Sequence, residues 1–151
     1  MALVSIFPYL KRAQQYHYAL PLFDMADMYG VDGLLAALEE KRASAIIAIY
    51  AGWLDQPNIR AFAAYIRTRA EAASVPVSLM LDHGGSFEQC IKAIAYGFTD
   101  VMYDGSRLPL EENIANTRAV VRAAHAVGLA VEAELGHVGS GSEYQEFGAQ
   151  R

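Results

Sequence analysis

The sequence predicts an α/β fold built on a parallel sheet. Short apolar runs alternate with longer helical segments, and the runs are apolar at consecutive positions, as in strands covered on both faces. The runs start at intervals of about 23 to 31 residues, close to the size of one βα unit. A (β/α)8 barrel needs about 250 residues, so the 151 residues here would hold little more than half of one. A five-stranded doubly wound sheet would also fit this length.

The expected elements follow one another in a regular order. Strands are expected at 18–23, 44–50, 75–81, 99–103 and 129–135, and helices at 26–41, 57–73, 87–96 and 110–127. Gly97 and Gly128 stand just before a strand, where helix C-termini favour glycine. Ser86 with Gln89 fits a capping box at one helix start, and Pro109 followed by two glutamates fits another.

Composition and charge argue against several classes of protein. The net charge is −5 and the lysines and arginines form no run, which argues against a nucleic-acid or membrane partner. No window reaches the length of a membrane span, and the N-terminus lacks a signal-peptide pattern. The single cysteine, Cys90, cannot form an internal disulfide, so we expect a reducing, cytoplasmic compartment.

Polar side chains gather where the expected strands end. The loops that follow parallel strands meet at one edge of the sheet, and catalytic groups collect there. A histidine and carboxylates at successive strand ends form a nitrogen and oxygen donor set suited to a divalent metal such as zinc. In chain order, the ends carry Asp24 and Asp27, Tyr50 and Trp53, Asp82 and His83, Asp104, and finally Glu132, Glu134 and His137.

Asp82 and His83 are followed by two glycines. Neighbouring residues of a regular strand point to opposite faces. We expect Gly84 and Gly85 to supply a turn that lets both side chains bend into one site. The alternative is that Asp82 caps the turn and His83 is an ordinary surface histidine.

The other carboxylates also have simpler interpretations. Glu132 and Glu134 are two residues apart and share one face of their strand, so they could both face water on an edge strand. Asp104 could belong to an ordinary Asp-Gly turn, and Asp24 and Asp27 could contact substrate or cap the helix that follows. The residues alone leave these alternatives open.

Three sequence blocks, "LDHG", "VMYDGS" and "VEAELG", occur in this order within residues 79–141. This stretch closely resembles the class II, metal-dependent ketose-bisphosphate aldolases of the fructose- and tagatose-bisphosphate type. Residues 1–78 resemble the family in layout, with weaker identity. The resemblance implies a TIM barrel whose N-terminal part is this chain, as one domain over 1–151 with a mobile active-site loop over 136–151.

The resemblance also implies a zinc-dependent aldolase. The reaction would be the reversible cleavage of a ketose 1-phosphate or 1,6-bisphosphate to dihydroxyacetone phosphate and an aldehyde. Zinc would polarise the ketone while a carboxylate moves the proton, and a second divalent metal position is possible in the family. By position in the blocks, the implied metal ligands are His83, Asp104 and Glu134, the implied acid/base is Asp82, and Glu143 or Glu146 would serve a second proton transfer.

Two strand ends depart from the family pattern. The first ends in Phe23-Asp24 where the family has Phe-Asn, and "IYAGW" replaces a small hydroxyl residue after the second. Asp24 and Tyr50 are therefore expected to contact the substrate, with Tyr50 and Trp53 reshaping the aldehyde pocket. A Schiff-base mechanism is not expected, because it needs a lysine at a strand end. All three lysines, Lys11, Lys41 and Lys92, are expected in helices.

The family takes two more zinc histidines and its phosphate site from later strands. The expected partners are therefore the remainder of the barrel and a small phosphorylated sugar, and the family implies a homo-oligomer. An open half barrel would leave unpaired strand edges. Two alternatives stay open: a related metal-dependent lyase or epimerase that uses enediolate chemistry, and a noncatalytic half-barrel module that binds a partner through its exposed edge.

Overall fold

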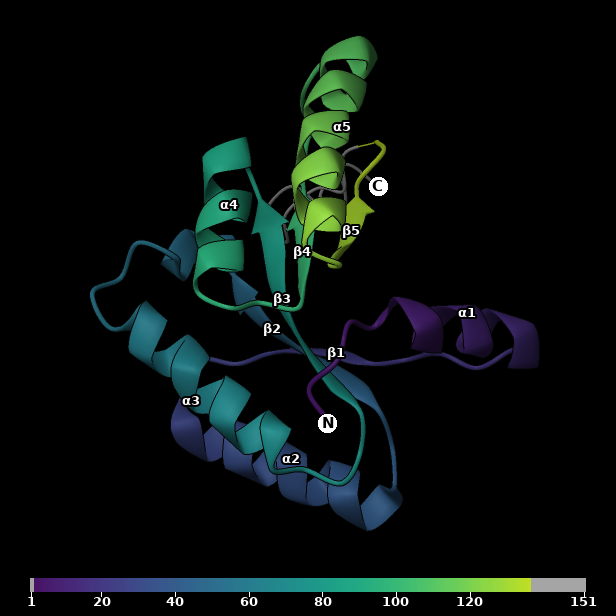
Figure 1. Cartoon of the computed structure of the whole chain (residues 1–151), viewed down its shortest axis with the longest axis vertical. Coiled ribbons are helices and arrows are strands. Elements are labelled where there is room, and N and C mark those ends of the chain that lie inside the picture. Colours follow the sequence, from purple (N-terminus) through teal and green to yellow (C-terminus); the bar gives the residue numbers. More distant parts are fainter. Residues whose placement is uncertain (1, 137–151) are drawn as a thin grey trace, which may run out of the picture.

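A five-stranded parallel sheet with helices around it forms the part of the chain described by the computed structural model, residues 2–136 (Figure 1). The loop expected over 136–151 lies outside the described residues, apart from Gly136. None of the described helices is long and apolar enough to cross a membrane. In chain order the elements are α1 (Phe7–Tyr16), β1 (Leu22–Asp24), α2 (Met28–Lys41), β2 (Ala45–Tyr50), the short 3-10 helix η1 (Ala51–Trp53), α3 (Ile59–Glu71), β3 (Val77–Gly84), α4 (Phe87–Ala95), β4 (Asp100–Tyr103), α5 (Leu110–Ala126) and β5 (Ala130–Ala133).

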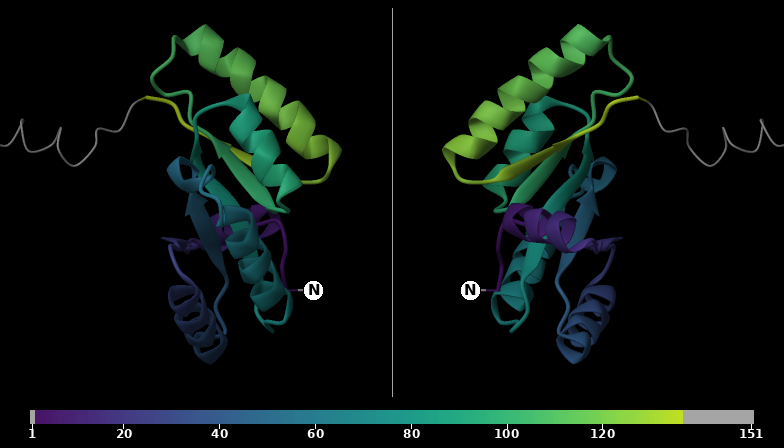
Figure 2. Two further views of the ribbon diagram at one scale, coloured as in Figure 1. Left: turned by 90° about the vertical axis from the view of Figure 1, so that its left-hand side faces the viewer. Right: turned by 90° about the vertical axis from the view of Figure 1, so that its right-hand side faces the viewer.

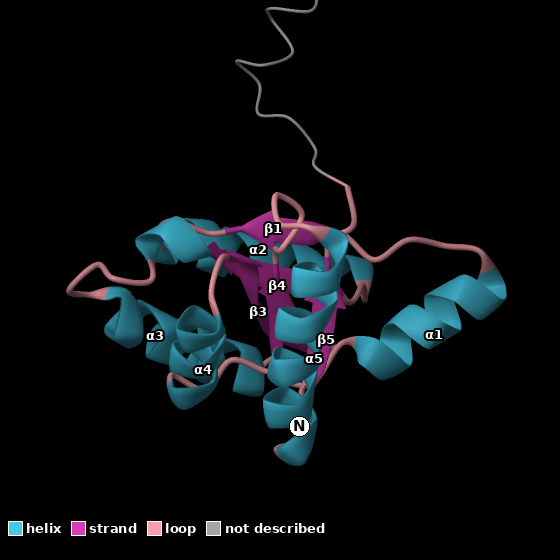
Figure 3. Cartoon of the chain, turned by 90° about the horizontal axis from the view of Figure 1, so that it is seen from above, coloured by secondary structure: helices cyan, strands magenta, loops and turns pink. Residues whose placement is uncertain are grey.

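The strand order distinguishes a barrel-type sheet from a doubly wound one. Each strand pairs in parallel with the next one in the sequence, which gives the order β1-β2-β3-β4-β5. A doubly wound sheet reverses its order at a switch point, whereas barrel strands follow one another without reversal. Figure 3 shows the strands in the centre with the helices around them. The five strands therefore have the arrangement of consecutive strands of a (β/α)8 barrel, as predicted.

Alternation along the strands divides the apolar side chains between two clusters. The larger cluster lies on the outer face, where residues such as Ile47, Leu79 and Val101 pack against α2 to α5. A smaller cluster on the inner face joins Ile46 and Met80 to residues near α1. Figure 2 shows α2 at one end of the sheet and α5 lying along β5 at the other. Most of the hydrophobic stabilisation thus comes from the outer face, and the inner face is left for polar groups near the strand ends.

No bounds were predicted for helix α1, although Lys11 was expected in a helix, and the strand expected at 18–23 is wrong except at its end. Only Leu22–Asp24 pairs with β2, while Phe7–Tyr16 forms a helix that stands apart from the other four (Figure 1). Ile6 is buried and Tyr9 packs with it against the inner face of the sheet. The spacing of Ile6, Tyr9 and the buried Ala13, together with a proline in the first turn, was a helix signal.

The predicted helix boundaries are correct to within a few residues, and their caps explain why. Gly97 and Gly128 both adopt positive φ, at 87° and 80°, directly after their helices. The Ser86 hydroxyl accepts a hydrogen bond from Gln89 N at 3.2 Å, as a capping box requires. The Gln89 side chain, however, accepts from Gly85 N at 2.8 Å and not from Ser86 N, so the reciprocal half of the box is displaced by one residue.

A buried carboxylate anchors the N-terminal segment beneath the sheet. Asp100, at the start of β4, is 2% exposed and accepts hydrogen bonds from Ser5 Oγ at 2.6 Å and Ile6 N at 3.0 Å. Burial raises the pKa of Asp100, and these hydrogen bonds counteract that rise. Ile6 is the N-cap of α1 and has no capping side chain of its own. Asp100 therefore supplies from a distance the acceptor that a local cap would provide.

We predict that Asp100→Ala destabilises the fold by about 2–3 kcal/mol, because the buried Ile6 N–H and the half-buried Ser5 hydroxyl lose their acceptor. Ser5→Ala is the matched control, since it removes one donor and leaves the bond from Ile6 N in place. Urea unfolding of the three proteins measures the difference. Equal loss in both variants would show that the bond to the α1 N-terminus contributes nothing.

Candidate metal centre

The end of β3 is irregular, and the irregularity places His83 beside the neighbouring strand. The pairing of β3 with β4 shifts between Leu81 and Gly84, which is the mark of a β-bulge. His83 itself adopts the left-handed conformation, with φ at 53°. The prediction that the two glycines supply the turn is wrong, because neither Gly84 nor Gly85 has a positive φ.

Gly84 is required for a different reason, which is close packing. A Cβ on Gly84 would lie 2.6 Å from the carbonyl oxygen of Met102 and 2.8 Å from Leu81 Cδ2. A Cβ on Gly85 would meet nothing closer than Gln89 Oε1 at 3.6 Å. The bulge can thus close against β4 only because residue 84 has no side chain.

Three side chains from adjacent strand ends converge next to this bulge. His83 Nδ1 lies 2.9 Å from Asp104 Oδ2 and 3.5 Å from Glu134 Oε2. One possible ligand atom from each of the three residues lies within 4.8 Å of the other two. The carboxylates are more enclosed than the imidazole, with exposed side-chain fractions of 23% for Asp104 and 15% for Glu134 against 44% for His83. The structure therefore brings together the three residues that the sequence comparison implied as ligands.

Asp104 serves both the turn and the cluster. Its Oδ1 accepts a hydrogen bond from Ser106 N at 3.0 Å, which closes an Asx-type turn. Its Oδ2 faces His83. The two interpretations left open for Asp104 are compatible, since each uses a different oxygen.

The pKa values of His83 and Asp104 are shifted in opposite directions. Burial acts to lower the pKa of His83, but its hydrogen bond with Asp104 and the charges of Asp82, Asp104 and Glu134 outweigh this and raise it. Burial acts to raise the pKa of Asp104, yet hydrogen bonds from Ser106 and His83 hold it below its usual range. Asp104 is therefore ionised at neutral pH, as a metal ligand must be.

Three nearby acids behave differently from Asp104. Burial raises the pKa of Asp82, and the negative charges of Asp24, Asp104 and Glu134 raise it further, although His83 lowers it. The pKa values of Asp24 and Glu132 are also raised, first by burial. Carboxyl groups whose environments push their pKa values apart are candidates for separate acid/base roles. Among these acids, Asp82 lies next to His83 in the chain, and the charges of all three cluster residues affect its pKa.

The first two strand ends contribute different kinds of group. Asp27 caps α2, because its Oδ1 accepts from Gly30 N at 2.8 Å. Tyr50 pairs in register with Asp82, is 44% exposed and lies edge-on to Trp53 with ring centroids 6.0 Å apart. Tyr50 is therefore adjacent to the cluster along the sheet.

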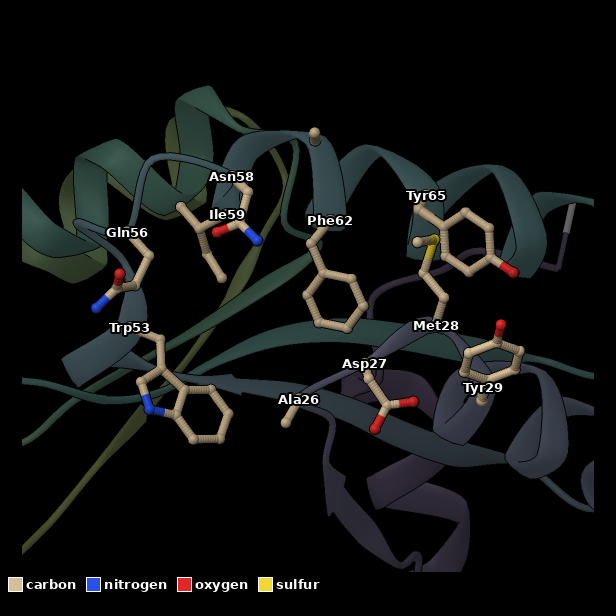
Figure 4. A pocket seen from close by; sticks show the side chains of 11 residues that line it. Ala26, Asp27, Met28, Tyr29, Trp53, Gln56, Asn58, Ile59, Phe62 and Tyr65 are labelled. Carbon is tan, nitrogen blue, oxygen red and sulfur yellow. The ribbon is translucent and has the colours of Figure 1, made fainter.

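Trp53 belongs to a separate apolar hollow of about 470 Å³ between the N-terminal parts of α2 and α3. Figure 4 shows its indole on one side of this hollow, with Phe62, Tyr65 and Tyr29 further along it. None of the three cluster residues lines the hollow. Trp53 thus lies apart from the three cluster residues, and its expected effect on an aldehyde pocket stays a prediction.

Some expected residues lie outside the described part of the chain. His137, Glu143 and Glu146 are among them, so their predicted roles stay predictions. All three lysines of the sequence lie in helices, namely α1, α2 and α4. A Schiff-base site at a described strand end is excluded by that placement.

Comparison with known proteins assigns the family. A family model described as fructose-bisphosphate aldolase class-II matches residues 4–150. The chain belongs to this family. A probable fructose-bisphosphate aldolase of Bacillus subtilis is 40% identical over 142 residues, which cover 92% of this chain and 50% of that protein. A 6-phospho-5-dehydro-2-deoxy-D-gluconate aldolase of Bacillus licheniformis is 38% identical over 158 residues, which cover 98% of this chain and 54% of that protein.

A solved aldolase structure has the same fold as this chain. The crystal structure of the YdjI aldolase from Escherichia coli K12 superposes with a TM-score of 0.85 and 34% identity. The superposition covers 96% of this chain and 55% of that one. The resemblance stated from the three sequence blocks and the half-barrel fold are thus confirmed. The chain spans about half the length of the curated relatives it matches.

The donor set of this class II chain fits a divalent metal such as zinc. Two ligands of a tetrahedral zinc ion, each bound at about 2.1 Å, lie about 3.4 Å apart. The separations of 2.9 and 3.5 Å from His83 Nδ1 to the two carboxylates are close to that value. Two carboxylates and one imidazole also leave room for further ligands. The described cluster therefore offers three donors of the kinds that bind a divalent metal.

One polar residue beside the cluster was not predicted from the sequence. Asn113, in the first turn of α5, is 6% exposed, and its Nδ2 donates to the Glu134 carbonyl oxygen at 2.9 Å. A single asparagine near a helix start carries no pattern that would predict this contact.

We predict that Gly84→Ala destabilises the fold by about 1–3 kcal/mol, because the new methyl group overlaps the Met102 carbonyl and forces the bulge apart. Gly85→Ala is the matched control and should leave stability nearly unchanged, since its Cβ has ordinary contacts. Thermal unfolding of the two variants tests this. A Gly84→Ala chain as stable as Gly85→Ala would show that the close contact is not required.

We predict that His83 titrates above its usual pKa of about 6.5 in the metal-free chain. Because its folded pKa is raised, the attraction to the acids stabilises the fold fully below about pH 6.5 and is lost as the pH rises through the folded pKa. Asp104→Asn should lower the pKa of His83, whereas Asp55→Asn, which affects an exposed pair with Lys92, should not. Histidine-ring NMR titration measures both, and an unchanged pKa in Asp104→Asn would contradict the assignment.

Proposed function

We propose that the protein is a metal-dependent aldolase that cleaves a ketose 1-phosphate or 1,6-bisphosphate reversibly to dihydroxyacetone phosphate and an aldehyde. The observation that carries the proposal is the convergence of His83, Asp104 and Glu134 at adjacent strand ends. Family membership supports the reaction class.

In this proposal His83, Asp104 and Glu134 hold zinc, with a second divalent metal position open to the two carboxylates. Bound zinc would supply the Lewis acid that polarises the substrate carbonyl. Asp82 exchanges the proton of the substrate hydroxyl, for which a raised pKa is suited because the group must alternate between acid and base near neutral pH. Glu143 remains the proposed group for the second proton transfer.

Asp24 and Tyr50 are the proposed substrate contacts of this half of the site. Asp24 ends β1 and is close enough to Asp82 to raise its pKa. Tyr50 pairs in register with Asp82 and its ring is exposed, so the ring can form one side of the aldehyde subsite. Relatives of nearly equal identity are named for fructose bisphosphate and for 6-phospho-5-dehydro-2-deoxy-D-gluconate. Both names describe phosphorylated sugars, and that is the substrate class we propose.

We also propose that the remaining strands of a barrel complete the site with further ligands and a phosphate-binding loop. The described sheet has unpaired edges at β1 and β5. Leu110 and Ile114 on α5 and Leu135 after β5 are 54%, 40% and 79% exposed, as expected for a face that another βα unit covers. The homo-oligomer implied by the family and the cytoplasmic location expected from the single cysteine belong to the same proposal, and the buried free thiol of Cys90 supports a reducing compartment.

Zinc titration of the purified 151-residue chain tests the site. The wild type should bind zinc, and His83→Ala should weaken binding by at least about tenfold because it removes the only nitrogen ligand of the cluster. His125→Ala is the control, since His125 is in the last turn of α5, far along that helix from Asn113. Isothermal titration measures all three affinities.

Condensation of dihydroxyacetone phosphate with a panel of aldehydes, catalysed by the protein completed with the remaining barrel strands, then separates the proposed reaction from its alternatives. Zinc-dependent condensation supports the aldolase. Zinc binding at His83 without condensation of any aldehyde favours the related lyase or epimerase. If zinc binding is absent in the completed barrel, or is unaffected there by His83→Ala, the metal site is wrong and the noncatalytic module is favoured.

A further inference from the structure

We infer that Asn113 is a positioning residue that sets the orientation of Glu134 toward the metal site. This inference rests on the site proposed above. Among the described residues, only three polar or charged side chains are buried, and Asn113 is the one at the carboxyl ends of the strands. A buried amide must be hydrogen-bonded, so its partners show what it holds in place.

The amide nitrogen of Asn113 is used on the metal-site side. Its Nδ2 donates to the main-chain oxygen of Glu134 at 2.9 Å. The regular pairing of β5 with β4 ends at Ala133, so Glu134 lies one residue beyond the last ladder pair. The bond from Asn113 is therefore what constrains the Glu134 main chain just where strand pairing stops.

The amide oxygen of Asn113 is used on the opposite side. It accepts a hydrogen bond from Thr117 Oγ1 at 3.0 Å, one turn further along α5. It also lies so close to Gly105 that a Cβ there would collide with it. Gly105 follows Asp104 directly, so Asn113 packs against the backbone next to two of the three proposed ligands. The orientation of the Asn113 amide is thus restrained by Thr117 and Gly105, on the side away from the Glu134 carbonyl.

These contacts give Asn113 a role without direct contact to the metal. Holding the Glu134 carbonyl restrains the main chain from which the Glu134 side chain starts, and the carboxylate of that side chain lies 3.5 Å from His83 Nδ1. Outer groups that orient ligands commonly change metal affinity by about 10- to 100-fold when removed. A merely structural asparagine would tie α5 to β5 and affect unfolding, but it would not act through the Glu134 carboxylate.

Zinc affinity of four full-length variants tests the inference, with a chromophoric chelator as competitor and zinc alone as the probe. Asn113→Leu should weaken zinc binding by about 10- to 100-fold. Thr117→Val, which removes only the bond on the far side of the amide, should weaken zinc binding far less than Asn113→Leu, because the bond to Glu134 and the packing against Gly105 remain. Glu134→Gln should weaken binding, and the double variant Asn113→Leu/Glu134→Gln should bind no more weakly than Glu134→Gln alone. Asn113→Ser replaces Asn113→Leu if circular dichroism shows that the leucine chain does not fold.

Additive effects of the two substitutions would overturn the inference, because Asn113 would then act independently of Glu134. Wild-type affinity in Asn113→Leu would overturn it as well. Failure of the proposed function looks different: the wild-type chain would bind no zinc, or Glu134→Gln would bind it as the wild type does, and the positioning role would fall with the site.

Discussion

The close approach of Gly84 to the Met102 carbonyl is the constraint on which the site depends. It allows β3 to bulge against β4 without parting from it, and the bulge turns His83 into the left-handed conformation. A regular strand would have continued the alternation and directed His83 to the helix-covered face. The imidazole instead reaches Asp104 on the neighbouring strand end. Geometry at one glycine thus determines whether three polar groups can meet.

Concentrating acids at one edge of the sheet is costly unless something offsets their charge. Asp24, Asp82 and Glu132 have raised pKa values, which shows that ionisation is opposed there. The only cationic group among the cluster residues is His83 when protonated. A divalent cation would relieve the same repulsion more fully, which is the physical reason for the metal proposal. The opposite end of the sheet handles its one buried acid differently, by surrounding Asp100 with hydrogen-bond donors.

Much of the fold could be predicted because its signals are local. Consecutive apolar residues indicated β2 to β4, and the glycines after two helices indicated where those helices end. The bounds of helix α1 were missed although its spacing was a helix signal, because Phe7, Leu10 and Tyr16 are also apolar and obscure the stripe in the sequence. The segment before β1 was assigned to a strand because composition cannot tell whether an apolar run has a pairing partner.

The sequence by itself determined the order of strands and helices along the chain, the family, and the residues that form the cluster. The first follows from the local apolar pattern, and the other two follow from three short sequence blocks. The tertiary structure decided what each residue does there. In the folded chain His83 adopts the left-handed conformation, Gly84 packs closely against β4, and Asn113 donates a hydrogen bond to Glu134. These assignments depend on which atoms of β4 and α5 lie against β3 and β5, and no periodicity within one segment specifies the distance between two.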